Sequence, residues 1–255
     1  MLLKNISKDK LCGYVYDTRE EMGKAAAKKA AEAINEILET KKYANVVFAA
    51  APSQNEMLES LLKQDVDFSK VNAFHMDEYV DFHLDVPQSF ANYLTQHIFA
   101  KAEFRTVNYI GDAGRNVDET LERYTRLLSE YPVDVVLLGI GENGHIAFND
   151  PPVADFNDEH LIKKVQLDEK CRNQQVHDGC FPTLDDVPTH ALTLTVPALL
   201  SAKYMICTVP ASTKAQAVYD MLNSDIGEHC PATALRLHDG AFLFLDRDSA
   251  AKIID

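Results

Sequence analysis

Tryptophan is absent from this chain, and basic residues are scarce beside acidic ones. The 255 residues include 25 Lys and Arg against 39 Asp and Glu, which gives a formal net charge of −14. Such a charge repels nucleic-acid phosphates and anionic membranes, so we expect neither as a partner. A small phosphorylated substrate is not excluded, because it needs only a few local donors to bind.

Cysteines are few and irregularly spaced, and long apolar runs are missing. The cysteines form no Cys-x-x-Cys pair and number five: Cys12, Cys171, Cys180, Cys207 and Cys230. An odd number without a signal peptide predicts a protein of the reducing cytoplasm with no disulfide framework. No apolar run approaches the length of a membrane span.

Short apolar segments alternate with segments of helical pattern along the chain. Strands are expected at residues 45–50, 71–76, 107–110, 134–140, 204–209 and 241–245. Helices are expected at residues 19–40, 54–63, 88–99, 117–130 and 212–222. Residues 151–190 are polar and punctuated by proline, which predicts a long loop with a short helix. The alternation predicts an α/β fold over residues 1–255: one Rossmann-like domain, with a mostly parallel sheet and helices on both faces.

Residues 134–152 combine an apolar run with glycines, a histidine and prolines. The spacing of Gly139, Gly141 and Gly144 matches the dinucleotide fingerprint, but that motif opens a helix of several turns. Pro151 and Pro152 would cut such a helix short, so no nucleotide is expected. His145 follows the strand end, where α/β sheets bind ligands, and suits proton transfer near neutral pH. The alternative is a structural glycine turn with a satisfied histidine.

Two carboxylates follow the strand at 71–76. Asp77 or Glu78 could serve as the base that removes a proton beside a carbonyl. In an extended chain the two point to opposite sides, so only one should face a site. The alternative interpretation is a helix N-cap with a solvated acid.

Two segments resemble anion sites, and one arginine is a further candidate. In residues 209–215, a strand leads through a polar turn to the start of a helix, where Lys214 could bind phosphate. The alternative is an ordinary helix cap by Ser212 with Lys214 in solvent. In residues 49–55, Ala51, Ser53 and Gln54 follow a strand in similar geometry, without glycine. Arg236 could reach an anion or pair with one of the many acids.

Together these segments resemble the glucosamine-6-phosphate deaminase/isomerase and 6-phosphogluconolactonase superfamily, in order and over nearly the whole chain. The matches are Phe74–Tyr79, Ser89-Phe90, Leu138–Pro151, Ala191-Leu192-Thr193, Lys214-Ala215 and Asp246 followed by Ser249-Ala250. The string His-Ile-Ala-Phe-Asn-Asp-Pro is similar to the deaminase branch; the lactonases differ after the histidine.

The resemblance implies a reaction and a set of roles. His145 would open the pyranose ring, and Asp77 would move a proton from C2 to C1. A hexosamine 6-phosphate, glucosamine or galactosamine 6-phosphate, would then become a ketohexose 6-phosphate plus ammonia. Asn143 and Asp150 would assist His145. The implied substrate contacts are Ala51, Ser53, Gln54, Glu78, Gly141, Gly144, Arg172 and Lys214. No metal or other cofactor is implied.

The chain departs from the family pattern near the histidine and the phosphate loop. Asn143 stands where the family has an aspartate, so it can hold the imidazole but cannot stabilise its charged form. Asp150 replaces a longer glutamate. The usual Gly/Ser/Thr-rich phosphate loop is replaced by residues 50–54, and Arg172 is the candidate for a family arginine in a shifted segment. The reaction class is therefore better specified than the sugar.

Three other functions remain open on the sequence. A plain sugar-phosphate isomerase and a lactonase-type hydrolase are alternatives within enzymes. A non-catalytic sugar-phosphate sensor is the alternative of another class, but the eighteen residues before the first expected helix are too few for a helix-turn-helix. A homo-oligomer is compatible with the resemblance.

Overall fold

The computed structural model describes residues 1–80, 82, 85–111 and 116–254. Its main sheet has eight strands in the order β1-β2-β11-β10-β7-β3-β4-β6. These strands are β1 (Leu2–Lys8), β2 (Leu11–Tyr16), β3 (Ala44–Phe48), β4 (Val71–His75), β6 (Thr106–Asn108), β7 (Val135–Leu138), β10 (Tyr204–Val209) and β11 (Ala241–Asp246). All neighbours pair in parallel except β1 with β2. The predicted mostly parallel sheet is confirmed.

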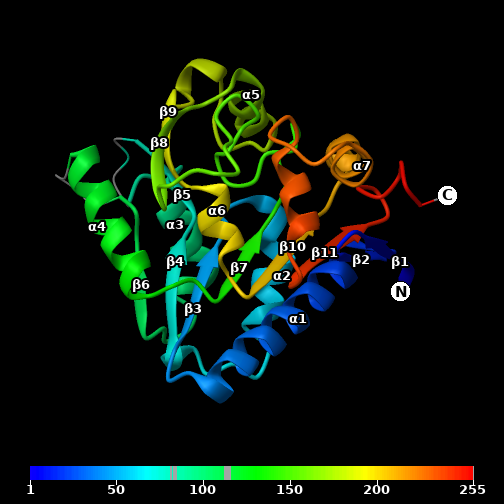
Figure 1. The fold of residues 1–255 in the computed structure, drawn as a ribbon, viewed down its shortest axis with the longest axis horizontal. Helices are drawn as coiled ribbons and strands as arrows, with labels where there is room; N and C mark the ends of the chain where they lie inside the picture. The colour runs from blue at the N-terminus through cyan, green and yellow to red at the C-terminus, as the bar shows by residue number, and fades with distance from the viewer. Residues whose placement is uncertain (81, 83–84, 112–115, 255) are drawn as a thin grey trace.

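Helices cover both faces of this sheet (Figure 1). They are α1 (Arg19–Thr40), α2 (Asn55–Leu61), α3 (Phe90–Leu94), α4 (Val117–Glu130), α5 (Glu169–His177), α6 (Val196–Leu200) and α7 (Ala215–Asn223). Shorter turns of helix are η1 (Pro52–Gln54), η2 (Phe68–Lys70), η3 (Thr95–Phe99), η4 (Leu184–Asp186), η5 (Ser212–Lys214) and η6 (Pro231–Leu237). Helices α1 and α2 pack on one face, and α4, α6 and α7 pack on the other.

Helix α1 shows how the sequence specifies this packing. Thr18 caps its start by accepting a hydrogen bond from the Glu21 amide at 3.2 Å. Its alanines are buried against the sheet, because small side chains let the helix approach closely. At Gly23, a Cβ would lie 2.5 Å from the Glu56 Cβ, so α1 and α2 need a glycine at their crossing.

A second, antiparallel sheet follows directly from the end of β4. It has the order β5-β9-β8, with β5 (Asp77–Tyr79), β8 (Ile162–Gln166) and β9 (His190–Leu194). Only Met76 separates β4 from β5, so this sheet lies at the carboxyl end of β4. Tyr79 of this sheet packs with aromatic side chains of neighbouring segments, Phe90, Phe148 and Phe181, in a separate apolar cluster. Figure 1 shows this sheet and α5 beyond one end of the large sheet.

The strands that the sequence did not predict include β1, β2, β5 and β8, and several predicted strands extend one or two residues past the observed ends. The β1–β2 hairpin was not expected at all. The segment 151–190, expected to be a long loop with a short helix, contains α5 as that helix but also the strand β8. The strand predicted at 134–140 ends at Leu138, because the glycines after it turn away. Among the described residues, no helix has the length and apolar character needed to cross a membrane.

Candidate active site

One cavity lies at the carboxyl ends of four adjacent strands, β10, β7, β3 and β4. The strand order reverses between β3 and β7, since β3 leads toward β4 and β6 while β7 leads toward β10 and β11. Such a switch point is where open α/β sheets bind ligands. Side chains from all four strand ends line it, with α1 and α5 completing the wall: Arg19, Ala51, Ser53, Met76, Asp77, Gly141, His145, Gln175, Asp178, Ala211 and Lys214 among them.

Asp77 forms part of the cavity wall where β4 passes into β5. Its side chain is buried, with 7% of the residue exposed. Burial raises the pKa of Asp77 well above its ordinary value, and the negative charge of Glu78 adds to the shift. A carboxyl group of this kind is a stronger base than an exposed aspartate once it is ionised.

Glu78 points to the other side of β5 and does not line the cavity. Its Oε1 accepts hydrogen bonds from the amides of Tyr79 at 3.0 Å and Phe90 at 3.1 Å, and its Oε2 accepts one from Ala91 at 2.9 Å. Burial raises the pKa of Glu78 to about 7, opposed by these amide hydrogen bonds. This position does not support the predicted role of Glu78 as a substrate contact, which stays a prediction; in the structure this residue holds the start of α3.

The imidazole of His145 lines the cavity and is held through one ring nitrogen. Its Nδ1 lies 2.7 Å from Oδ1 of Asn143 and 2.9 Å from Oδ1 of Asp150. The remaining nitrogen, Nε2, is left to reach a ligand. A tight loop returns the chain to make this possible, with the Gly141 amide donating to the His145 carbonyl at 2.9 Å.

Asp150 and Asn143 act on His145 from behind, since neither lines the cavity. Asp150 is fully buried, and the Asn143 Nδ2 donates to its Oδ1 at 2.9 Å. Burial favours the neutral form of Asp150, but the charge of His145 and the hydrogen bonds from His145 and Asn143 outweigh it and lower the pKa of Asp150. The shorter acid at position 150 thus supplies the negative charge that Asn143 lacks.

Two glycines of the loop have different tasks. At Gly141, which lines the cavity, a Cβ would lie 2.1 Å from Cε1 of His145, so the imidazole packs directly on the glycine. Gly144 has φ +82° and does not line the cavity; its Cβ would lie 2.6 Å from the Cys230 sulfur. Gly144 shapes the turn, so its predicted substrate contact is not supported by its position.

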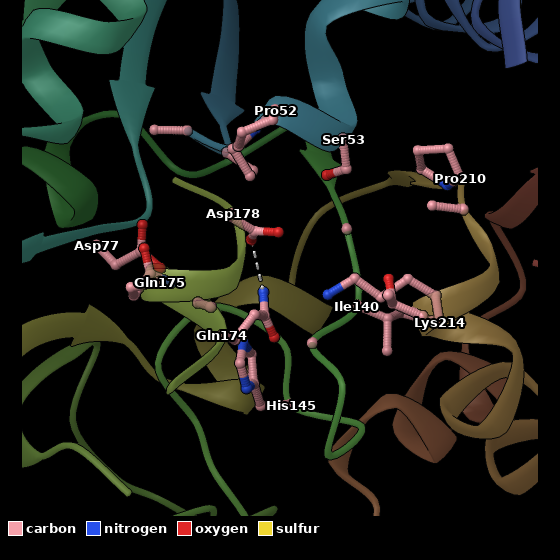
Figure 2. A pocket seen from close by; sticks show the side chains of 18 of the residues that line it. Pro52, Ser53, Asp77, Ile140, His145, Gln174, Gln175, Asp178, Pro210 and Lys214 are labelled. Carbon is pink, nitrogen blue, oxygen red and sulfur yellow. Dashed lines mark hydrogen bonds between the residues drawn. The ribbon is translucent and has the colours of Figure 1, made fainter. Parts of the chain in front are cut away.

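The wall across from Asp77 carries the features of an anion site (Figure 2). Ser53 and Ala51 come from the loop after β3, and Lys214 comes from the start of α7. Lys214 is 6% exposed, and its Nζ has no hydrogen-bond partner among the described residues. Burial lowers the pKa of Lys214, while the charges of Asp178 and Glu142 oppose the shift.

The backbone before Lys214 is held in an unusual conformation. Ala211 has φ +82°, a left-handed value rare for alanine. Its amide donates to both carboxylate oxygens of Asp246 at 3.0 and 3.2 Å, which anchor it to the end of β11. The turn is thereby fixed against the sheet at the entrance to α7.

Gln54, Arg172 and Arg236 lie outside the cavity. Gln54 is fully buried and donates to the Ser53 Oγ at 3.0 Å and the Thr208 carbonyl at 3.2 Å, so it positions the Ser53 loop. Arg172 donates to the carbonyls of Leu184 and Val187 at 2.6 and 2.9 Å. These positions do not support the predicted substrate contacts of Gln54 and Arg172, which stay predictions; both side chains hold scaffold groups in the structure. Arg236 pairs with Asp9 at 2.6 Å.

Four polar residues of the cavity were missed by the sequence analysis: Arg19, Gln174, Gln175 and Asp178. Arg19 begins α1, where it donates to the Pro52 carbonyl and pairs with Glu56 at 2.8 Å. Gln174 and Gln175 belong to α5, and Asp178 follows it. The sequence pattern of this segment did not predict that the helix lies at the cavity. The Glu142 amide donates to Gln174 at 2.9 Å, which joins α5 to the histidine loop.

The nucleotide alternative is not supported by the loop. No helix follows Gly144 before β8 within residues 116–254. The chain instead closes a bridge between Ile146 and Asn149 and turns through Pro151 and Pro152. The three glycines therefore present a histidine, and not a helix N-terminus, to the cavity.

A comparison with known families agrees with this geometry. The sequence model of the family described as glucosamine-6-phosphate isomerases/6-phosphogluconolactonase matches residues 17–244. The chain belongs to this family. Its relatives include a glucosamine-6-phosphate deaminase of Bacillus cereus, 32% identical over 235 residues, which covers 92% of this chain and 86% of the relative. The deaminase of Listeria innocua is 30% identical over 227 residues, covering 89% and 95%.

Solved structures also resemble this chain. A monomeric glucosamine-6-phosphate deaminase superposes with a TM-score of 0.85 at 28% identity, covering 94% of this chain and 98% of the other. The 6-phosphogluconolactonase of Thermotoga maritima gives a TM-score of 0.75 at 21% identity, covering 92% and 99%. The second likeness concerns the fold alone.

Proposed function

We propose that the protein is an amino-sugar phosphate deaminase/isomerase. It would convert a hexosamine 6-phosphate, such as glucosamine or galactosamine 6-phosphate, to a ketohexose 6-phosphate and ammonia. The observation that carries this proposal is the arrangement of one cavity: a buried carboxylate, Asp77, and an acid-supported imidazole, His145, share it with the anion-binding features around Lys214.

His145 opens the sugar ring in this proposal. Its Nε2 removes the proton of the C1 hydroxyl and delivers a proton to the ring oxygen as the C1–O bond to that oxygen breaks. Asp150 stabilises the imidazolium formed in between, since its carboxylate contacts Nδ1 at 2.9 Å. Asn143 holds the ring in place through the same nitrogen.

Asp77 then moves a proton between adjacent carbons. Its carboxylate removes the C2 proton and returns it to C1, which converts the open-chain aldehyde and amine to a C2 imine. Water adds to C2 and ammonia leaves, giving the ketone. A base in a partly dry cleft suits this transfer because its raised pKa makes it a better proton acceptor.

The phosphate binds at the Ser53 and Lys214 wall in this proposal. Lys214 offers an ammonium group without another partner among the described residues, and Ser53 offers a hydroxyl. The start of η5 and α7 adds backbone amides of the kind that favour phosphate. Ala51, which also lines the cavity, contributes shape rather than charge.

Three alternatives differ from this proposal in what they need from the cavity. A lactonase hydrolyses an ester and has no need for a base at a sugar carbon. A plain isomerase would use Asp77 but release no ammonia. A sugar-phosphate sensor would bind without turnover. The buried Asp77 opposite Lys214 favours a deaminase or isomerase over a lactonase, and the relatives named glucosamine-6-phosphate deaminase favour the deaminase over a plain isomerase.

A panel of amino-sugar phosphates assayed for ammonia tests the proposal. Turnover is expected with at least one 2-amino-2-deoxyhexose 6-phosphate, together with formation of a ketohexose 6-phosphate. Asp77→Asn should lower that turnover by about 10² or more, with substrate affinity largely kept. Ketose formation without ammonia, or hydrolysis of a 6-phosphogluconolactone at a higher rate, would replace the deaminase with the corresponding alternative. A cytoplasmic location and a homo-oligomer stay predictions.

A further inference from the structure

A cluster of three potential metal ligands lies behind the catalytic histidine. A nitrogen of His145, a carboxylate oxygen of Asp150 and the sulfur of Cys171 all lie within 4.8 Å of one another. All three side chains are buried. Asp150 and His145 come from the loop after β7, whereas Cys171 comes from α5, so the fold brings them together from separate segments.

One oxygen of the cluster has no well-formed hydrogen bond. Oδ1 of Asp150 is engaged by Asn143 and His145, whereas Oδ2 makes no hydrogen bond of ordinary geometry among the described residues, although Asp150 is fully buried and the backbone amide of Asp168 lies near its carboxylate. A buried carboxylate oxygen is costly to leave unpaired. The thiol of Cys171 faces the same carboxylate; burial raises its pKa well above the usual range, and the negative charge of Asp150 and a hydrogen bond to it add to the shift.

A second cavity also reaches Asp150. It is lined by Asp168, Glu169 and Arg172 among others, and it shares no lining residue with the cavity of the proposed substrate. Asp168 adds a further carboxylate near the cluster, since its Oδ2 lies 3.5 Å from the Asn143 Nδ2. This cavity gives a route to the cluster other than through the substrate site.

We propose that His145, Asp150 and Cys171 form an inhibitory site for a borderline-soft divalent cation, with Zn²⁺ as the best fit. Imidazole, carboxylate and thiolate are the ligands that Zn²⁺ takes in proteins, and water fills the fourth position. Binding displaces the thiol proton, as metals do to coordinating cysteines. Hard cations such as Mg²⁺ do not choose a thiol and should not compete.

The consequence for activity rests on the proposed function. Zn²⁺ on the Nδ1 side of His145 replaces the contact with Asp150 and prevents the imidazole from carrying two protons. The ring-opening step then loses its acid. Inhibition should therefore be strongest for cyclic substrate, and bound zinc should not displace a sugar phosphate from the Lys214 wall.

The test combines a spectroscopic readout with inhibition. Co²⁺ added to the protein should give a thiolate-to-cobalt charge-transfer band that Cys171→Ser abolishes and that Cys180→Ser, the matched control on the same segment, retains. Zn²⁺ should inhibit ammonia release, and Cys171→Ser should raise the half-inhibiting concentration by at least about tenfold, because even indirect partners of a metal contribute that much to its affinity. Mg²⁺ at the same concentrations should leave activity unchanged.

The outcomes separate this site from the proposed function. A cobalt band in a protein without deaminase activity would support the site and refute the proposed reaction. A missing band, or zinc inhibition that is equal in the parent and Cys171→Ser, would overturn the site. Cys171→Ala provides a second variant in case a serine beside Asp150 prevents folding.

Discussion

The side chains at positions 77 and 78 show how far local reasoning reaches. Alternation in an extended segment predicted that only one of the two carboxylates faces the site, and the structure bears this out. The alternation could not say which one, because that depends on the sheet that β5 joins. Asp77 faces the cavity, while Glu78 accepts three amide hydrogen bonds at the start of α3.

The acid limb of the pH–rate profile should report Asp77. The base must be ionised to work, so kcat/KM falls as pH drops through its pKa; because burial and Glu78 raise that pKa, the fall should begin at higher pH than for an ordinary aspartate at about 3.9. Glu78→Gln removes the second cause and should move the limb to lower pH. Profiles of the two proteins on one amino-sugar phosphate measure this. A limb that does not move in Glu78→Gln would assign it to another group.

Asn143 and Asp150 both support the His145 imidazole: Asn143 holds the ring and Asp150 supplies a negative charge. Their variants should therefore have different effects on the rate. Asp150→Asn removes the only carboxylate that contacts the imidazole among the described residues, so kcat should fall about tenfold or more. Asn143→Asp places two carboxylates within a 2.9 Å contact, and like charges so close hold a proton between them. The net charge beside His145 then changes little.

Steady-state measurements of kcat and kcat/KM on one amino-sugar phosphate compare the two variants. A large change of rate in Asn143→Asp, with a rate near that of the parent in Asp150→Asn, would show that Asp150 is not the acid partner. From the sequence alone, Asp150 could replace the charge missing at Asn143 only if the loop folds back onto His145. The distance between Asp150 and His145 along the chain does not specify the turn that brings them into contact.

Among the secondary-structure elements, the strand ends were more predictable than the connections. All six predicted strands have counterparts that begin and end within two residues of the expected range, because buried parallel strands are short apolar runs. The β1–β2 hairpin and β8 were missed. These strands carry mixed polar and apolar residues, since one side of each faces solvent or lies at an edge, and such patterns resemble loops.

In the loop after β7, Gly141 leaves the space in which the imidazole of His145 packs. In Gly141→Ala the new Cβ would overlap the ring of His145, so the imidazole must move. A misplacement of about 1 Å can cost about 10²-fold in rate, so kcat should fall strongly. Inhibition by inorganic phosphate should be retained, because Lys214 and Ser53 are untouched. Both quantities come from steady-state kinetics.

A second glycine provides the control for that variant. Gly227 also lies beside an imidazole, with a Cβ position 3.1 Å from Nδ1 of His229, but it does not line the cavity. Gly227→Ala should therefore keep near-parent activity. Equal losses in the two variants would mean that the effect arises from general destabilisation and not from the position of His145.

The arrangement of the complete sheet decides where the site forms. Alternating strands and helices predicted a parallel sheet, and the family resemblance added which residues act. Neither predicted that α1 and α5 would close the cavity with Arg19, Gln174, Gln175 and Asp178. These contacts join segments about 150 residues apart, and no periodicity within either segment carries that information. For the same reason the sequence placed Arg172 and Gln54 at the substrate, whereas they hold carbonyl groups of the scaffold.

Although the chain as a whole is strongly acidic, its substrate cavity contains the buried cation Lys214. The net charge is −14, yet Lys214 lies on the cavity wall with 6% of its surface exposed. Attraction for a phosphate dianion must therefore come from groups in direct contact, because the charge of the chain as a sum opposes its approach. At alkaline pH, the affinity for the phosphate should therefore depend on whether Lys214 is protonated.

Sugar-phosphate binding should weaken at a lower pH than an ordinary lysine would dictate. Burial lowers the pKa of Lys214 in the free protein, so the ammonium loses its proton below the usual value of about 10.4, and kcat/KM should fall as pH rises through that shifted pKa. At saturating substrate the bound phosphate keeps the lysine charged, so kcat should fall less. Asp178→Asn removes a negative charge that stabilises the ammonium form of Lys214, so it should move this alkaline limb to still lower pH.

Lys214→Met should raise KM and abolish the limb. A limb that persists in Lys214→Met belongs to another group, and Lys214 would then have to be removed from the phosphate site.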